Sequence, residues 1–110
     1  MKRKVVYVCS PLKGNYEKNI VKANLYCRYA YEKGCIPLAP HVIFTQFLDD
    51  TKKTERKIGR EMGLQLLEKC DAIWVFGSLI SEGMKAEIEY AKTHGIKIKH
   101  IKEEDLEDWH

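Results

Sequence analysis

Residues 71–101 read DAIWVFGSLISEGMKAEIEYAKTHGIKIKHI, and this stretch decides the fold. The apolar run within residues 71–77 is unbroken, which is typical of a central strand covered on both faces. Residues 82–94 follow with a helical pattern that ends at Gly95. Residues 96–101 alternate apolar and basic side chains, as a half-exposed edge strand does. The stretch therefore predicts a strand, a helix and a second strand.

The N-terminal region begins with the same kind of unit. Residues 5–9, VVYVC, form a short apolar run rich in β-branched side chains, and residues 10–15 carry turn chemistry. A helix is predicted over residues 16–33, with Asn15 as its N-cap and Gly34 at its end. We expect the side chains that recur at three- and four-residue steps to face the core: Ile20, Ala23, Cys27, Ala30 and Tyr31.

Three further segments lie between these units. Residues 35–40 form a brief strand, and Pro37, which has no amide hydrogen to donate, places that strand at a sheet edge. Residues 41–47 fit either a short helical turn or an ordered loop. A second long helix is predicted over residues 54–69, and the residues expected to face inward are Ile58, Met62, Leu66 and Leu67.

The alternation of strands and helices defines the fold class. It implies right-handed crossovers and a parallel sheet between helix layers. Continuous apolarity in the first and third strands makes them central, which gives the order 2-1-3-4. We therefore predict a three-layer α/β fold, a Rossmann or flavodoxin-like sheet of about four strands with helices on both faces. The order reverses between strands 1 and 3, so a ligand is expected at residues 10–15 and 77–83.

These two loops carry the polar residues that could hold an anion. Residues 77–83 let backbone amides at a helix start face an anion, and Ser81 can either cap that helix or donate to a phosphate oxygen. Ser10, Lys13 and Gly14 form the facing loop. The sequence has neither a P-loop nor a Gly-x-Gly-x-x-Gly fingerprint, which argues against the common NTPase and dinucleotide-binding modes.

Glu87 is the most informative ionisable residue. It shares a helix face with Gly83, Met84, Tyr90 and Ala91. Lys85 and Glu89 lie roughly opposite and are expected to pair with each other in water. A carboxylate on the inward face needs a hydrogen-bond donor or a catalytic task, and Tyr7 on the neighbouring central strand is a plausible donor. The residues alone leave both a structural and a catalytic glutamate open.

Other features of the sequence restrict the class of protein. The four cysteines contain no Cys-x-x-Cys pair and the four histidines have no ligand-like spacing, so we expect neither a metal site nor a cofactor. The basic run at residues 52–60 is interpreted as a solvated helix face, and the acidic residues 103–108 argue against a nucleic-acid partner. No apolar run is long enough to span a bilayer and no signal-peptide core follows Met1, so we expect a cytoplasmic protein without a membrane partner.

Several of these motifs together resemble those of the nucleoside 2-deoxyribosyltransferase-like superfamily. The resemblance covers about Tyr7 to Ile98. Within the superfamily, the sequence is most similar to the 2′-deoxynucleoside 5′-monophosphate N-glycosidase branch and to bacterial and phage domains with Pro-His and Trp-x-Phe/Tyr-Gly segments. The segments that carry it are residues 6–10 with Lys13-Gly14, Pro40-His41, Asp71-Ala72, Trp74-Val75-Phe76-Gly77, Ser81-x-Gly83-x-x-x-Glu87-Ile88-x-Tyr90-Ala91 and Gly95-Ile96.

The resemblance implies a glycosyl transfer reaction on a nucleoside or nucleotide. The glutamate matching Glu87 attacks the anomeric carbon, and the tyrosine matching Tyr7 orients it. A serine at position 81, where the transferases carry an acid, favours a 5′-phosphorylated substrate. The phosphate would then be bound by a set of candidates from both loops: Ser10, Lys13, Gly14, Ser81 and Gly83.

One departure from the family pattern opens an alternative. The glycosidases place an aspartate near the leaving base at a position that falls on Gly63 here. Glu61, Asp49 or His41 could substitute for it, and His41 is included among the candidate substrate-binding residues. Without such an acid the chain could instead be a non-catalytic protein that binds, senses or sequesters a nucleotide derivative.

The resemblance also implies how the chain is organised. Residues 1–102 are expected to form a single nucleoside 2-deoxyribosyltransferase-like domain, with residues 103–110 as an acidic tail. The family commonly assembles its active sites across a dimer interface, so a homodimer or higher homo-oligomer is expected. Gly59 and Gly63 on one helix face each cost about 1 kcal/mol relative to alanine, which indicates close approach of another helix or of a ligand.

Overall fold

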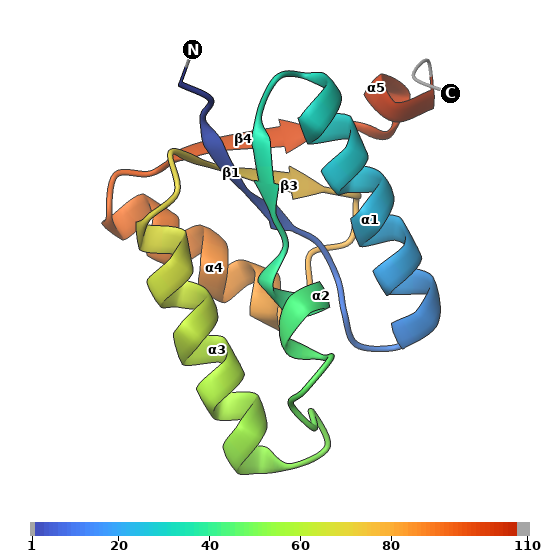
Figure 1. Ribbon diagram of the computed structural model, residues 1–110, viewed down its shortest axis with the longest axis vertical. Coiled ribbons are helices and arrows are strands. Elements are labelled where there is room, and N and C mark those ends of the chain that lie inside the picture. Colours follow the sequence, from blue (N-terminus) through green and yellow to red (C-terminus); the bar gives the residue numbers. More distant parts are fainter. Residues whose placement is uncertain (1, 108–110) are drawn as a thin grey trace.

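A four-stranded parallel sheet forms the centre of the computed structural model, which describes residues 2–107 (Figure 1). Its strand order is β2-β1-β3-β4. Every neighbouring pair is parallel, with Tyr7 of β1 opposite both Leu38 of β2 and Ile73 of β3. The predicted fold class and strand order are confirmed. The strands are β1 (Val5–Cys9), β2 (Ile36–Leu38), β3 (Ala72–Phe76) and β4 (Lys97–Ile101).

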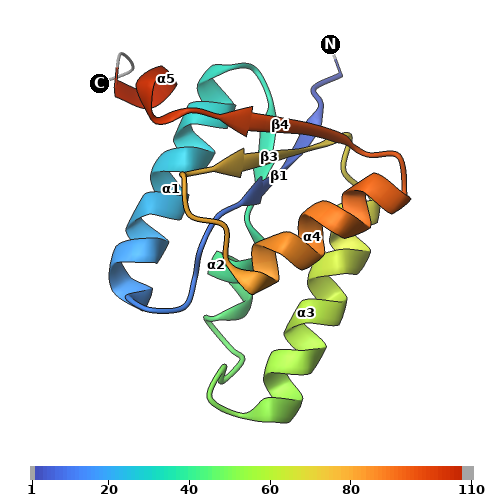
Figure 2. The ribbon, with the colours of Figure 1, turned by 180° about the vertical axis from the view of Figure 1, so that it is seen from behind.

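Helices cover both faces of the sheet. One face carries α1, and the other carries α4 with α3 beside it (Figures 1 and 2). The sequence allowed either a helical turn or a loop at residues 41–47. In the structure, residues 41–44 belong to a short helix that has Pro40 in its first turn. The helices are α1 (Tyr16–Glu32), α2 (Pro40–Phe44), α3 (Lys53–Glu68), α4 (Glu82–Thr93) and α5 (Glu103–Glu107).

Alternation along the central strands divides the core into two clusters. Side chains of successive strand residues point to opposite faces, so β1 and β3 each contribute to both clusters. The α1 side holds Val6, Val8, Tyr29, Ala30, Trp74 and Phe76. The other side holds Tyr7, Cys9, Leu67, Ile73, Val75, Met84 and Ala91. Tyr7 and Cys9 are therefore directed toward the layer of α3 and α4.

Two of the predicted core positions are wrong. Tyr31 is 59% exposed, with Arg28 stacked on its ring, and Tyr29 is buried in its place. Both tyrosines lie about 100° from the centre of the apolar face of α1, on opposite sides. Two rings of β3 pack edge-on against Tyr29, Trp74 at 6.2 Å and Phe76 at 6.1 Å. Ile58 is likewise exposed, near the outer end of α3.

The ends of the helices mostly follow the predicted signals. The side chain of Asn15 accepts a hydrogen bond from the amide of Lys18, and Ser81 accepts one from the amide of Met84. The pairing of Lys85 with Glu89 is wrong, because Lys85 pairs with Glu82 at 3.3 Å instead.

The predicted acidic tail begins as the short helix α5. Leu106 of α5 packs against the core cluster on the α1 side. The remainder of the predicted tail, including Trp109 and His110, lies outside the described residues. Among residues 2–107, no helix has both the length and the apolar character needed to cross a bilayer.

The packing predicts how stability responds to two leucine substitutions. Leu67 is fully buried between α3 and the sheet, whereas Leu79 is 80% exposed in the loop after β3. Leu67→Ala should lower the free energy of unfolding by about 2–5 kcal/mol, because it removes buried methyl groups and leaves a cavity. Leu79→Ala should change it by less than about 0.5 kcal/mol. Urea denaturation followed by circular dichroism measures both, and equal effects would contradict the described core.

Candidate active site

A cavity of about 410 Å³ opens at the carboxyl end of β1. Its lining comes from residues 10–13 after β1, residues 40–50 in and after α2, residues 55–64 of α3 and residues 81–87 at the N-cap and start of α4, with Tyr7 also reaching it. Parts of both predicted loops, residues 10–13 and 81–83, line this cavity, while residues 77–80 border a second hollow.

Glu87 lies at the inner end of this cavity with a hydrogen-bond donor on each carboxylate oxygen. The hydroxyl of Tyr7 donates to Oε2, which is the contact that the sequence predicted. The thiol of Cys9 donates to Oε1 at 3.4 Å. This second donor was missed, although Cys9 lies two residues after Tyr7 and must share its face of the sheet. The two contacts join α4 to the middle of the sheet.

Burial controls the ionisation of this group of side chains. It raises the pKa of Glu87 to about 7, and the hydrogen bonds from Tyr7 and Cys9 partly oppose that shift. The pKa of Tyr7 and the pKa of Cys9 are raised well above their ordinary values by burial and by the nearby carboxylate. Tyr7 and Cys9 therefore remain protonated donors at neutral pH, while Glu87 can change its charge there.

Ser10 and His41 form a second polar pair on the wall of the cavity. The hydroxyl of Ser10 and Nε2 of His41 share a hydrogen bond of 3.0 Å. Burial lowers the pKa of His41 to about 4, so the imidazole is neutral at pH 7. The structure thus brings together two candidates that the sequence placed in separate motifs.

The other loop candidates occupy different positions around the opening. Lys13, Ser81 and Gly83 line the cavity, and Ser10, Lys13 and Ser81 also border a second hollow on the α1 side. Ser81 is the N-cap of α4, so its structural role is observed. Gly14 lines neither hollow, and its φ of +107° shows that it serves the turn before α1.

Gly63 packs directly against the phenol of Tyr7. A Cβ atom added at Gly63 would lie 3.3 Å from the Tyr7 hydroxyl oxygen, whereas one at Gly59 would lie 3.4 Å from a methyl group of Leu48. The glycine pair therefore lets α3 approach the cavity and Tyr7. Of the residues considered as replacements for the missing aspartate, His41 lines the cavity, while Glu61 and Asp49 do not.

The basic run on α3 is a solvated face that also borders the cavity. Lys52, Lys53 and Lys57 are exposed and outside the cavity, but Arg56 and Arg60 line it. The run is therefore largely exposed, as expected for a solvated face, and Arg60 is exposed while Arg56 is half-buried, but these two side chains also line the cavity. The sequence contained a signal for the position of the two arginines, because each precedes one of the two glycines by three residues and shares its helix face.

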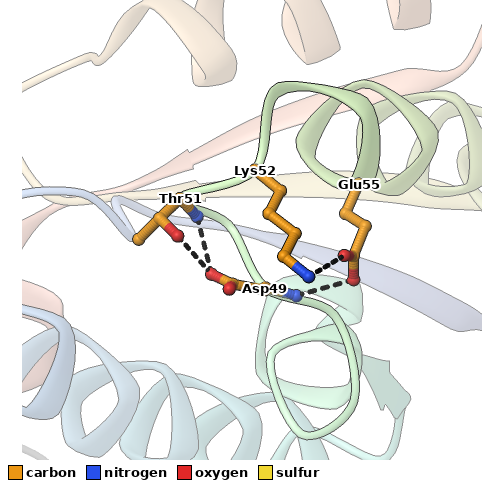
Figure 3. A network of polar contacts seen from close by, with 4 residues as sticks. All are labelled: Asp49, Thr51, Lys52 and Glu55. Carbon is orange, nitrogen blue, oxygen red and sulfur yellow. Dashed lines mark hydrogen bonds and ion pairs between the residues drawn. The ribbon is translucent and has the colours of Figure 1, made fainter.

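Polar contacts hold the segment between α2 and α3 at the outer side of the cavity. Asp49 accepts hydrogen bonds from the amide and hydroxyl of Thr51, and its own amide donates to Glu55 at 3.0 Å (Figure 3). Lys52 pairs with Glu55 at 3.6 Å. The hydroxyl of Tyr16 donates to Asp50, which connects this segment to the start of α1.

A family model described as a domain of unknown function, DUF7768, matches residues 4–101. The chain belongs to this family. The matched range includes all four strands, α1 to α4 and the entire cavity lining. No curated protein matches the DUF7768 chain.

A solved structure shows the same fold as this DUF7768 domain. It is a 2-deoxyribosyltransferase from the psychrotolerant bacterium Bacillus psychrosaccharolyticus, described as a biocatalyst for the synthesis of antiviral and antitumoral nucleosides. The superposition has a TM-score of 0.66 at 15% sequence identity and covers 87% of this chain and 70% of that chain. At this identity, the likeness shows a shared fold.

The described residues of the DUF7768 domain contain no candidate metal centre. Within residues 2–107, no group of three or more histidine, cysteine, aspartate or glutamate side chains is arranged to hold an ion. All four cysteines are free thiols, and Cys27 and Cys35 are only partly buried.

The raised pKa of Glu87 predicts how stability depends on pH. Because the folded pKa of about 7 exceeds the ordinary value of 4.5, ionisation costs the folded state as pH rises through this window. The unfolding free energy of the native chain should fall relative to that of Glu87→Gln by about 3 kcal/mol between pH 4 and pH 8. Chemical denaturation of both proteins at each pH measures this difference, and a constant difference would show that Glu87 is not desolvated.

The contact of Gly63 with Tyr7 predicts a second effect on Glu87. Gly63→Ala should displace the phenol, weaken its hydrogen bond and raise the pKa of Glu87 further, because that bond lowers it. Gly59→Ala is the matched control on the same helix and should leave this pKa unchanged. Carbon-13 NMR titration of the glutamate carboxyl measures the shift, and equal titration curves for both variants would contradict the described contact.

Proposed function

We propose that this domain cleaves the N-glycosidic bond of a nucleoside 5′-monophosphate, as an N-glycosidase or a deoxyribosyltransferase, with Glu87 as the nucleophile. One observation carries the proposal. A carboxylate lies at the inner end of a ligand-sized cavity, with a donor on each of its oxygens and a pKa near neutrality. A structural glutamate has no need of an open cavity in front of it.

The chemistry proceeds in two steps that conserve the configuration of the sugar. In the first, an oxygen of ionised Glu87 bonds to the anomeric carbon while the carbon–nitrogen bond breaks and its electrons go to the base. In the second, a water molecule or another base breaks the new ester and releases the sugar from Glu87. A fixed anion suits the first step because the transition state resembles an oxocarbenium ion.

Tyr7 and Cys9 orient the nucleophile in this proposal. Both keep their protons at neutral pH and both donate to Glu87, so the carboxylate plane is held in one orientation. Removal of a positioned contact can cost a large factor in rate even when substrate still binds.

The phosphate would lie at the loops that follow β1 and β3. Lys13 supplies positive charge there, Ser81 lies at the first turn of α4, and Ser10 presents a hydroxyl beside neutral His41. The start of a helix favours an anion because its amide groups point outward. The fold shared with a 2-deoxyribosyltransferase supports the choice of a nucleoside as the substrate class.

A nucleotide binder without turnover is the second candidate. The observation that favours it is Gly63, which supplies no acid at the position where the related glycosidases carry one. His41, the substitute that lines the cavity, has a pKa lowered to about 4 and is a weak proton source at pH 7.

Release of free base tests the proposed reaction. The purified chain should release base from at least one deoxynucleoside 5′-monophosphate, as measured by liquid chromatography, and Glu87→Gln should reduce the rate by about a thousandfold or more. The native rate should increase as pH rises through about 7, because the ionised carboxylate attacks.

Glu89→Gln serves as the control for this experiment. Glu89 is exposed on the same helix and lies outside the cavity, so its substitution should leave the rate within about twofold. Thermal stabilisation by nucleotides without base release from the native chain would support the binder in place of the enzyme.

A further inference from the structure

Two arginines lie on the α3 wall of the cavity, and Arg56 is close enough to the Tyr16 hydroxyl to favour its ionised form. Arg56 and Arg60 lie one helical turn apart, and neither forms a hydrogen bond or an ion pair with any described residue. Across the cavity, Lys13 is the remaining cation of the lining and is likewise unpaired in this part of the chain. A guanidinium that faces a cavity without a carboxylate partner can bind a planar anion with two hydrogen bonds.

The acidic residues of the lining are engaged elsewhere. Their formal charges nearly balance those of the cations, so contacts rather than net charge decide which groups are available. Asp50 accepts from Tyr16, Glu55 accepts from Asp49 and pairs with Lys52, Glu82 pairs with Lys85, and Glu87 accepts from Tyr7 and Cys9.

Glu87 itself is not the partner of these arginines. The pKa of Glu87 is raised by burial and lowered only by its two hydrogen bonds, with no contribution from a cation. The spacing agrees with this separation, because seven residues of helix, or about 10 Å, separate Gly63 beside Tyr7 from Arg56. Arg60 lies three residues, or about 4.5 Å of helix, from Gly63, so it is nearer the nucleophile than Arg56 is. The two arginines therefore follow the α3 wall outward from Gly63.

This inference rests on the proposed function. We propose that the leaving group of the substrate is a heterocycle with a carboxylate, and that Arg56 and Arg60 bind this carboxylate. A nucleotide whose phosphate lies at Lys13 and whose anomeric carbon lies at Glu87 directs its base toward the opposite wall, which is α3. Apolar side chains of Phe44, Leu48 and Leu64 line the same region and would contact the ring.

This assignment also accounts for the glycine at position 63. An aspartate there would press on the Tyr7 hydroxyl and would place a negative charge near an anionic base. When the carbon–nitrogen bond breaks, its electrons pass to the ring nitrogen, and the two guanidinium groups stabilise the charge that develops. The departing ring then takes its proton from water, so the bond-breaking step needs no acid from the protein.

Matched nucleotides test the inference by binding. Orotidine 5′-monophosphate and uridine 5′-monophosphate differ by one ring carboxylate, and calorimetry with the Glu87→Gln chain measures their affinities without turnover. We expect the orotidine nucleotide to bind at least tenfold more tightly. Arg60→Gln in that background should remove about tenfold of its affinity and change uridine nucleotide binding by less than twofold, with Arg56→Gln acting similarly.

Lys57→Gln is the matched control, because Lys57 lies on the same helix but is exposed and outside the cavity. It should alter neither affinity, and thermal melting of each variant verifies the fold. Equal affinity for the two nucleotides, equal losses for both in Arg60→Gln, or no binding of either would overturn the inference. Base release from deoxynucleotides by the native chain, measured separately, shows whether the proposed reaction survives that result.

Discussion

The attachment of Glu87 to the central strand is the constraint on which the site depends. Removing a carboxylate from water is costly, and the structure offsets that cost with two donors from one strand, Tyr7 and Cys9. Because donors two residues apart lie on the same face, β1 presents both to the single helix that carries the acid. The register of α4 against the sheet is thereby fixed, and the carboxylate is held at the edge of a cavity.

Close approach of α3 completes this arrangement. Gly63 allows the helix to lie against the phenol, and Gly59 one turn away allows Leu48 to fill the next layer. The same helix face carries Arg56 and Arg60 toward the opening. Along this face glycines that permit close packing alternate with cations that line the cavity, in the order Arg56, Gly59, Arg60 and Gly63.

The two ends of the cavity consequently differ in chemistry. Burial at the inner end raises the pKa of Glu87, and α3 and the loop after β1 supply the cations of the lining, Arg56, Arg60 and Lys13. A ligand that bridges these ends needs an uncharged centre and anionic groups at its periphery. The proposed nucleotide has these features, whereas an extended nucleic-acid strand would not fit a cavity of about 410 Å³. The expected homo-oligomer stays a prediction.

Local signals in the sequence determined the strands, the helix ends, the strand order and the inward direction of Glu87, because periodicity, caps and alternation depend on neighbours in the chain. The hydrogen bond from Tyr7 followed from that order. Tertiary packing alone decided which of Tyr29 and Tyr31 is buried, since both flank one helix face and the rings of β3 pack against Tyr29. It also decided that Arg56 and Arg60 face a cavity, because a helix pattern cannot show what lies opposite it.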